Sequence, residues 1–376
     1  MTMDWGIYVH VPWCRIRCPY CAFHVVPGEA SPPSERFIEQ ILREADQRTP
    51  FFSGEAKTLF FGGGTPSRLP PKTLARIIEG LPLAKNAEIS MEANPEDLEA
   101  AVLDGLTDAG IRRISVGIQT LSDTRARRLG RLHTLAKAEE ALALLKASDL
   151  SSWSADLMFG LPDSTTADLA EDLVRLLAFD PPHVSVYGLT IEDNTPFARA
   201  VARGRMTPLP DEAWRAQYDL LVTTLRDADI ERYEVSNFAR VGDECIHNEG
   251  YWSDRPYMGL GPSAHGFYPD GQRYRNLADT DRYLSGGDPT AHIEAPTRTQ
   301  AAMDYVASSI RSRMGIDLTH LAKRHRCEVR HSVSEQLGHA GMVAAGQERI
   351  RLTEDGFPVA DSVASRLVEG LQDLTG

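Results

Sequence analysis

Short β-rich runs alternate with longer helical patterns over about the first 190 residues of this 376-residue chain, and this alternation limits the possible folds most strongly. The pattern predicts strands at residues 7–11, 58–61, 88–93, 113–117, 154–158 and 183–189. Helical patterns separate them at 34–48, 72–80, 96–109, 135–147 and 166–178. Strands that alternate with helices pair in parallel through right-handed crossovers. The pattern therefore predicts an α/β fold, and it fits an open Rossmann-like sheet as well as a partial or full α/β barrel.

The remaining chain is organised differently. Residues 195–290 are less regular, rich in aromatic side chains and in turns. Further on, the pattern predicts helices at 300–314 and 318–325, a hairpin of 342–345 and 349–352, and a last helix at 354–371 that Thr353 caps. These elements indicate a small winged-helix-like module. We therefore predict a core at 1–195, an irregular α+β extension at 196–295 and a C-terminal module at 296–376.

Charge and hydropathy narrow the possible partners. The chain has 53 acidic and 40 basic residues, a net charge of −13, whereas binding to nucleic acid or to anionic membranes needs a basic face. No run of about 18 apolar residues occurs, and the N-terminus lacks the charged-then-apolar pattern of a signal peptide. We expect a cytoplasmic protein that is not integral to a membrane and does not bind nucleic acid.

Three of the five cysteines lie within eight residues, at Cys14, Cys18 and Cys21. An odd number of cysteines makes a poor disulfide framework, and thiolates are soft ligands that suit zinc and iron–sulfur clusters. A structural zinc site needs four ligands, and no fourth ligand stands at zinc-finger spacing. A [4Fe–4S] cluster held by three thiolates would leave one iron free. Arg15 and Arg17 would favour the thiolate forms. The simpler alternative is a chance cluster of cysteines.

The spacing Cys-x3-Cys-x2-Cys after an N-terminal strand resembles that of the radical S-adenosylmethionine (SAM) superfamily. In that superfamily the amino and carboxylate groups of SAM bind the fourth iron, and SAM is cleaved to a 5′-deoxyadenosyl radical. The resemblance implies a partial or full α/β barrel. We accordingly expect a partial (β/α)6 barrel.

Five ordered motifs resemble those of the oxygen-independent coproporphyrinogen oxidase family, over about residues 5–267. They are YVHVPWC at 8–14, FGGGTPS at 61–67, SMEANP at 90–95, SVGIQ at 115–119 and DLMFGLP at 156–162.

The glycine-rich motif follows a predicted strand. Glycines there let a ligand approach the backbone without meeting a Cβ atom, although such a run is most often only a turn. The resemblance implies that Gly63, Gly64 and Thr65 bind the amino group of SAM. It also places Tyr8 and Tyr20 among the SAM-binding residues, with Tyr20 covering the cluster or the adenine; a packing role is the alternative.

Three further polar residues stand at equivalent places on predicted strands, and ligands of parallel α/β folds bind at the carboxyl ends of the strands. Glu92, Gln119 and Asp156 would accept hydrogen bonds from SAM; each could instead be a solvated or capping residue. Arg131 matches a family arginine that can hold a carboxylate through two hydrogen bonds. Its alternative is a surface arginine in an arginine-rich stretch.

Two departures argue against coproporphyrinogen oxidation. The oxidase has an extra cysteine two positions after the third, where this chain has Phe23. The oxidase also has a long segment before its first cysteine, which here is already residue 14.

The haem chaperone branch (HemW) lacks that extra cysteine and carries His-Asn-x-x-Tyr-Trp, which this chain has at 247–252. An imidazole can ligate haem iron, and aromatic side chains can pack on a porphyrin. We predict His247 as a haem ligand, with Cys245 as an alternative; Cys327 is expected to be structural. One departure is Ala22, where relatives commonly have Asp.

The sequence thus predicts a radical-SAM-type haem chaperone that binds a [4Fe–4S] cluster, SAM and haem. Haem-acceptor proteins and an electron donor are its expected partners. The alternatives are a radical SAM enzyme acting on a porphyrinogen, a HemN-like methyltransferase or cyclopropanase, and a degenerate member with only a structural metal. Whether the protein is an enzyme, and its oligomeric state, stay open.

Overall fold

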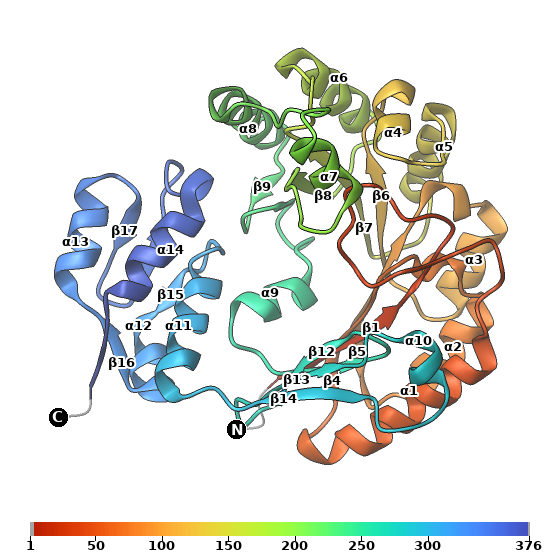
Figure 1. Cartoon of the computed structure of the whole chain (residues 1–376), viewed down its shortest axis with the longest axis horizontal. Coiled ribbons are helices and arrows are strands. Elements are labelled where there is room, and N and C mark those ends of the chain that lie inside the picture. Colours follow the sequence, from red (N-terminus) through yellow and green to blue (C-terminus); the bar gives the residue numbers. More distant parts are fainter. Residues whose placement is uncertain (1–3, 375–376) are drawn as a thin grey trace.

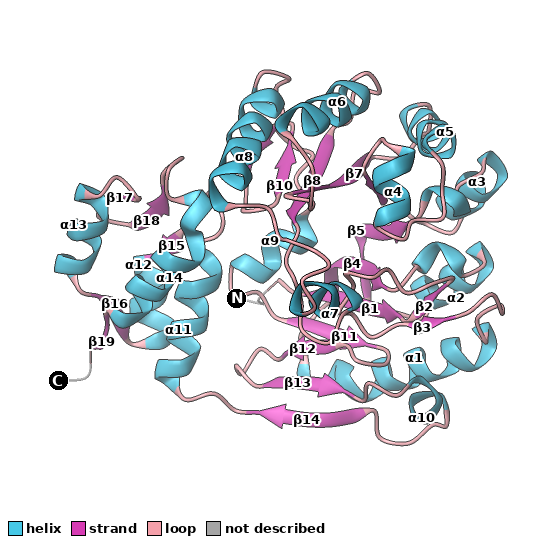
Figure 2. Ribbon diagram, turned by 45° about the horizontal axis from the view of Figure 1, so that its top comes forward, coloured by secondary structure: helices cyan, strands magenta, loops and turns pink. Residues whose placement is uncertain are grey.

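A computed structural model describes residues 4–374, and a twelve-stranded sheet forms its centre (Figures 1 and 2). Six of its strands are parallel and adjacent in chain order: β1 (Gly6–Val11), β4 (Ala56–Gly63), β5 (Leu83–Ala93), β6 (Arg113–Gln119), β7 (Ser152–Phe159) and β8 (His183–Gly188). A Rossmann sheet reverses its strand order at a switch point, and this one does not. The predicted α/β fold is confirmed, and the strand order is that of a barrel.

These strands form because apolar residues alternate along them, so that one face of the sheet is apolar and is buried beneath the helices. Ile7, Val9, Leu59, Ile114 and Leu157 are fully buried in one hydrophobic core. Six helices lie outside the strands in Figure 1: α1 (Ser34–Arg48), α2 (Pro71–Glu79), α3 (Ala100–Asp108), α4 (Asp123–Arg128), α5 (Leu135–Lys146) and α6 (Thr166–Leu177).

The prediction of a helix at 96–109 is wrong for its first residues. A 3-10 turn occupies Pro95–Asp97, and α3 begins only at Ala100. Leu98 and Glu99 between them are extended, and the Leu98 side chain is fully buried in the core.

The segment expected to be irregular extends both edges of the sheet. It contains α7 (Pro196–Ala202), α8 (Asp211–Arg226), β9 (Glu231–Arg232), β10 (Asn237–Ala239), α9 (Ile246–Trp252), β11 (Tyr257–Leu260), β12 (His265–Phe267), β13 (Arg273–Asn276), α10 (Thr280–Leu284) and β14 (Thr290–Glu294). Strand β11 pairs in parallel with β1, whereas β10 pairs antiparallel with β8. The sheet therefore continues across residue 195, and the domain boundaries remain a prediction.

The C-terminal part contains α11 (Arg298–Ser309), β15 (Ile316–Asp317), α12 (Leu318–His320), a π turn (Leu321–His325), β16 (Cys327–Val329), α13 (His331–His339), β17 (Val343–Ala345), β18 (Arg349–Leu352), α14 (Ala360–Glu369) and β19 (Leu371–Asp373). The predicted hairpin is confirmed by the antiparallel pair β17 and β18.

The helix predicted at 354–371 is wrong at both ends. The Thr353 hydroxyl accepts a hydrogen bond from the Gly356 N–H at 3.1 Å, which closes a turn and does not cap α14. Helix α14 begins at Ala360, after a 3-10 turn that contains Pro358, and Leu371 begins β19. The proline lacks an N–H for helical bonding, which explains the late start. Among the described residues, no helix has both the length and the apolar character needed to cross a membrane.

Candidate cofactor site

A cavity of about 600 Å³ opens at the carboxyl ends of the parallel strands. All three clustered cysteines line it from one loop, whereas Glu92, Gln119 and Asp156 come from three separate strands. Eight of the nine predicted SAM residues also line it, namely Tyr20, Gly63, Gly64, Thr65, Glu92, Gln119, Arg131 and Asp156. The structure thus brings together in one cavity residues that are as far apart in the sequence as Cys14 and Asp156.

The cysteine loop leaves the end of β1 and is anchored beside it. Short strand β2 (Trp13–Cys14) pairs with β3 (Val26–Pro27), so both ends of the loop are fixed next to each other. Within it the Cys21 N–H donates to the Cys18 carbonyl at 3.1 Å. All three thiols are partly exposed, and none forms a disulfide. Three sulfurs on one tight loop, facing a cavity, fit the donor set of a cluster with one free iron.

The expectation that Arg15 and Arg17 favour the thiolate forms holds for Arg17 at Cys21, but burial outweighs its effect. Burial raises the pKa of Cys14 and of Cys21, and the charge of Arg17 only partly offsets this at Cys21. Arg15 instead forms an ion pair with Asp97 at 2.8 Å. Thiols with raised pKa values need a metal to hold them as thiolates at neutral pH.

The loop at the end of β4 needs glycines, because neighbouring atoms leave no room for a Cβ atom. Gly63 has a φ of 106°, and a Cβ there would lie 2.4 Å from the His10 ring. A Cβ at Gly64 would lie 2.6 Å from the Val11 carbonyl oxygen. The Gly63 N–H donates to a Glu92 carboxylate oxygen at 3.0 Å. These glycines therefore let the ends of β1 and β4 meet and orient a carboxylate at the cavity.

Two carboxyl groups of the cavity are held in an unusual state. The pKa of Glu92 is raised to about 7. Burial is the main cause, and the nearby charge of Asp156 adds to it. Burial also raises the pKa of Asp156 to about 6, against the hydrogen bond that the Ser115 hydroxyl donates at 2.7 Å. Two such groups attract a cation, because a positive charge between them favours ionisation of both.

Gln119 reaches the cavity through a distorted strand end. Its φ is 68°, in the left-handed region, and the pairing of β6 with β7 shifts register between Gly117 and Gln119. Irregularities of this kind re-aim a side chain next to a binding site. They are visible only in the structure, because nothing in the local sequence marks them.

Arg131 is buried and only partly satisfied. One terminal nitrogen donates to Asn94 Oδ1 at 2.5 Å and to the Gly117 carbonyl at 2.7 Å, and the other lies 3.9 Å from Cys18 Sγ. Its Nε is buried and has no hydrogen-bond partner among the described residues. A buried donor without a partner is costly, and Arg131 also lines the cavity, where its positive charge favours a carboxylate ligand. Sequence reasoning did not single out Asn94, which also donates to the Thr65 hydroxyl at 3.2 Å.

Tyr8 does not line this cavity. It lies beside a smaller one of about 190 Å³, and its hydroxyl is 3.0 Å from His10 Nδ1. Its contact with SAM stays a prediction. Two lining residues that the motifs did not identify are Tyr187, at the end of β8, and Phe23, which is 65% exposed at the cavity.

His247 lies at the other end of the strands. Its Nδ1 is 2.8 Å from the Thr58 hydroxyl, and its Nε2 is 2.8 Å from the Tyr251 hydroxyl. The ring stacks on Phe60 with the centroids 5.2 Å apart, and burial lowers its pKa to about 3. Both ring nitrogens are therefore engaged, and ligation of a metal would require His247 to give up one of these bonds.

Cys245 is enclosed in the same region. It is buried, its sulfur lies 3.6 Å from a Glu88 carboxylate oxygen, and burial raises its pKa to about 12. The same carboxylate accepts the His247 N–H at 3.1 Å. Glu88 thus fixes the start of α9 against β5.

The comparisons with known proteins agree with this geometry. The model of the radical SAM superfamily matches residues 8–176. A heme chaperone HemW from Escherichia coli is 39% identical over 279 residues, 72% of each chain. One from Bacillus subtilis is 30% identical over 95% of this chain and 97% of its own. Among solved structures, coproporphyrinogen III oxidase (HemN) from Escherichia coli, a radical SAM enzyme, has the same fold, with a TM-score of 0.82 and 21% identity over 97% of this chain and 90% of its own.

Proposed function

Because the chain belongs to the radical SAM superfamily and, within it, to the HemW family, we propose that it is a haem chaperone that binds a [4Fe–4S] cluster, SAM and haem. The observation that carries the proposal is that the cysteine triplet and the SAM-binding residues expected from the family share one cavity, in a chain whose relatives are named heme chaperones. The protein would pass its haem to acceptor proteins.

Cys14, Cys18 and Cys21 are the ligands that we assign to the cluster. When bound, the cluster supplies one-electron chemistry and an open iron site for the amino and carboxylate groups of SAM. Arg131, which lines the cavity, would donate to that carboxylate, since a charged donor binds a carboxylate strongly.

The positive charge of SAM would face the two carboxyl groups of the cavity. Ionised Glu92 and Asp156 attract a cation, so that binding would draw a proton from Glu92, whose pKa of about 7 leaves it partly protonated at neutral pH. Gln119 would contribute an amide at the same edge.

Haem ligation by His247 remains a sequence prediction. It requires the ring to leave the Thr58 or the Tyr251 hydroxyl, and the burial of the ring makes this costly. Titration of the His247→Ala variant with hemin tests it directly.

Coproporphyrinogen oxidation is the alternative to exclude by experiment. We expect anaerobic incubation of the cluster-loaded protein with coproporphyrinogen III, SAM and a reductant to yield no protoporphyrinogen. We expect the hemin-loaded protein to transfer its haem to an added apo-haem protein. Formation of protoporphyrinogen, or retention of the haem by the protein, would overturn the proposal.

We further propose a cytoplasmic protein that receives electrons from a separate donor and does not bind nucleic acid. The acidic net charge of −13 supports the last point.

A further inference from the structure

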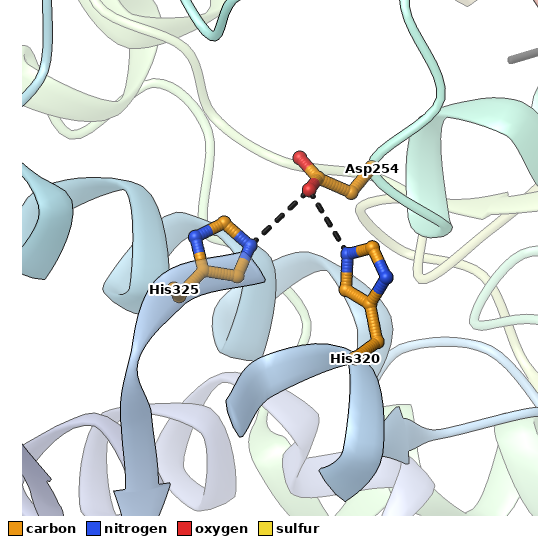
Figure 3. A group of neighbouring side chains, drawn as sticks. All are labelled: Asp254, His320 and His325. Atoms are coloured by element: carbon orange, nitrogen blue, oxygen red, sulfur yellow. Dashed lines mark hydrogen bonds and ion pairs between the residues drawn. The ribbon is translucent and has the colours of Figure 1, made fainter. Parts of the chain in front are cut away.

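A second cluster of metal-binding side chains lies far from the cysteine loop in the sequence. Asp254 follows α9, and His320 and His325 belong to the C-terminal module (Figure 3). We propose that these three side chains bind a divalent transition-metal ion, with Zn²⁺ as the test ion, and that the metal joins the C-terminal module to the segment that carries α9.

The chemistry of the three donors supports this assignment. Two imidazoles and one carboxylate form a common ligand set for zinc and for ferrous iron, and such sets leave further coordination positions to water. One donor atom from each of the three residues lies within 4.8 Å of the other two. His325 and Asp254 are shielded from solvent, whereas the His320 side chain is 36% exposed, which provides a path for entry of the ion.

The distances also fit. Each histidine Nε2 lies 3.2 Å from the same oxygen, Asp254 Oδ2. Ligands about 2.0–2.1 Å from a tetrahedral zinc ion lie about 3.3 Å from one another. Little movement would therefore be needed to admit the ion.

The backbone is shaped to bring the two histidines together. His320 and His325 are five residues apart, a spacing that an α-helix places about 140° apart around its axis. Here a π turn spans Leu321–His325, and its wider i→i+5 spacing brings both rings onto one face. Arg326 then ends the turn in the left-handed conformation, at φ 54°. Turns of this type occur often at functional sites.

Packing holds both rings in place. The Tyr305 ring stacks on His325 with centroids 5.3 Å apart and lies 4.8 Å from His320. Asp254 sits at a turn with φ 59°, a conformation that aspartate tolerates. The three donors thus come from positions that are fixed before any ion binds.

Arg324 is the competing cation. Its Nε lies 2.9 Å from Asp254 Oδ2, so the oxygen that would bind the metal already forms an ion pair. The metal would displace this bond, and the second carboxylate oxygen could then accept it. Removal of the arginine charge should therefore leave the affinity for metal unchanged or raise it.

The test uses untagged, cluster-loaded protein under anaerobic conditions, so that the cluster occupies Cys14, Cys18 and Cys21. Equilibrium dialysis against Zn²⁺ should give one ion per chain, and Zn²⁺ should raise the Tm by several degrees. Asp254→Asn and His320→Gln should each weaken binding at least thirtyfold and abolish the Tm shift. X-ray absorption at the zinc edge should show only nitrogen and oxygen ligands at about 2.0–2.1 Å.

His331→Ala is the matched control, because His331 is an exposed histidine of the same module, paired with Glu335. It should bind Zn²⁺ as the wild type does, and Arg324→Gln should bind it at least as tightly. Undiminished binding by Asp254→Asn and His320→Gln, weaker binding by Arg324→Gln, or a sulfur ligand at about 2.3 Å would overturn the proposal. Iron content and far-UV circular dichroism of each variant establish that it is folded.

Discussion

Arg131 and His247, at opposite ends of the parallel strands, use their nitrogen atoms in opposite ways. At the carboxyl ends, Arg131 retains an unsatisfied buried nitrogen, and Glu92 and Asp156 face a cavity with raised pKa values. Near the amino ends, His247 uses both ring nitrogens within the protein, and Glu88 accepts bonds from the start of α9. Both regions contain residues that the sequence marks as functional.

This difference indicates that a residue of a sequence motif can bind a ligand directly only where it has a donor or acceptor atom that the protein itself does not use. Buried polar groups are almost always bonded, so a charged group that is only partly bonded and lines a cavity is a candidate for ligand binding. A fully bonded group indicates a structural role until a rearrangement is demonstrated.

Replacing one cluster cysteine should remove the cluster. Reconstitution should give the wild type about four irons per chain, and we expect Cys18→Ser to lose nearly all of them. The cluster has only three protein ligands, so the loss of one leaves too few to hold it. Iron quantification and visible absorption measure this. Cys327→Ser, at a buried cysteine of the C-terminal module, is the control and should keep its iron.

Replacing His247 should destabilise the protein. His247→Ala leaves the Thr58 and Tyr251 hydroxyls without their partner and removes the stacking on Phe60, at a cost of about 3 kcal/mol or more. Urea denaturation measures it. A stable variant that no longer shifts the Soret band of hemin would contradict the structural role and support haem ligation.

Replacing Arg131 should weaken SAM binding. Arg131→Gln removes a charged hydrogen-bond donor worth about 1.5–3 kcal/mol, equivalent to roughly 10- to 150-fold in Kd. Isothermal titration of the cluster-loaded protein with SAM measures the change. Arg128→Gln is the control, because Arg128 is exposed and its nearest ion-pair contact, with Asp163, is 3.8 Å long. Equal affinities for both variants would refute the assigned role of Arg131.

SAM binding should tighten as the pH rises. The pKa of Glu92 is about 7, so its ionised fraction increases about tenfold between pH 6 and pH 8, and only the ionised form attracts the cation. We expect Glu92→Gln to bind more weakly at pH 8 and to show a flatter pH dependence.

The stability of the ligand-free protein should change in the opposite sense. The folded pKa of Glu92 lies above its ordinary value of 4.5, so the folded chain binds the extra proton and stability falls as the pH rises from about 4.5 to about 7. Thermal unfolding without SAM should therefore show Glu92→Gln gaining stability over the wild type above pH 7. No difference between them would contradict a raised pKa.

The sequence predicted what depends on spacing and missed what depends on packing. The three clustered cysteines and eight of the nine residues expected to bind SAM line one cavity, as motifs at strand ends indicate, and their binding roles stay predictions. The roles of Tyr8 and His247 depend on neighbours such as His10 and Thr58, which local sequence does not reveal. The six strands of the middle segment also escaped prediction, because each has only two to five residues and owes its pairing to distant partners.

The function proposed for the chain depends most directly on haem binding. Anaerobic titration of the cluster-loaded wild type with hemin should shift the Soret band and saturate at one haem per chain. A spectrum that stays that of free hemin throughout the titration would contradict the proposal that this protein is a haem chaperone.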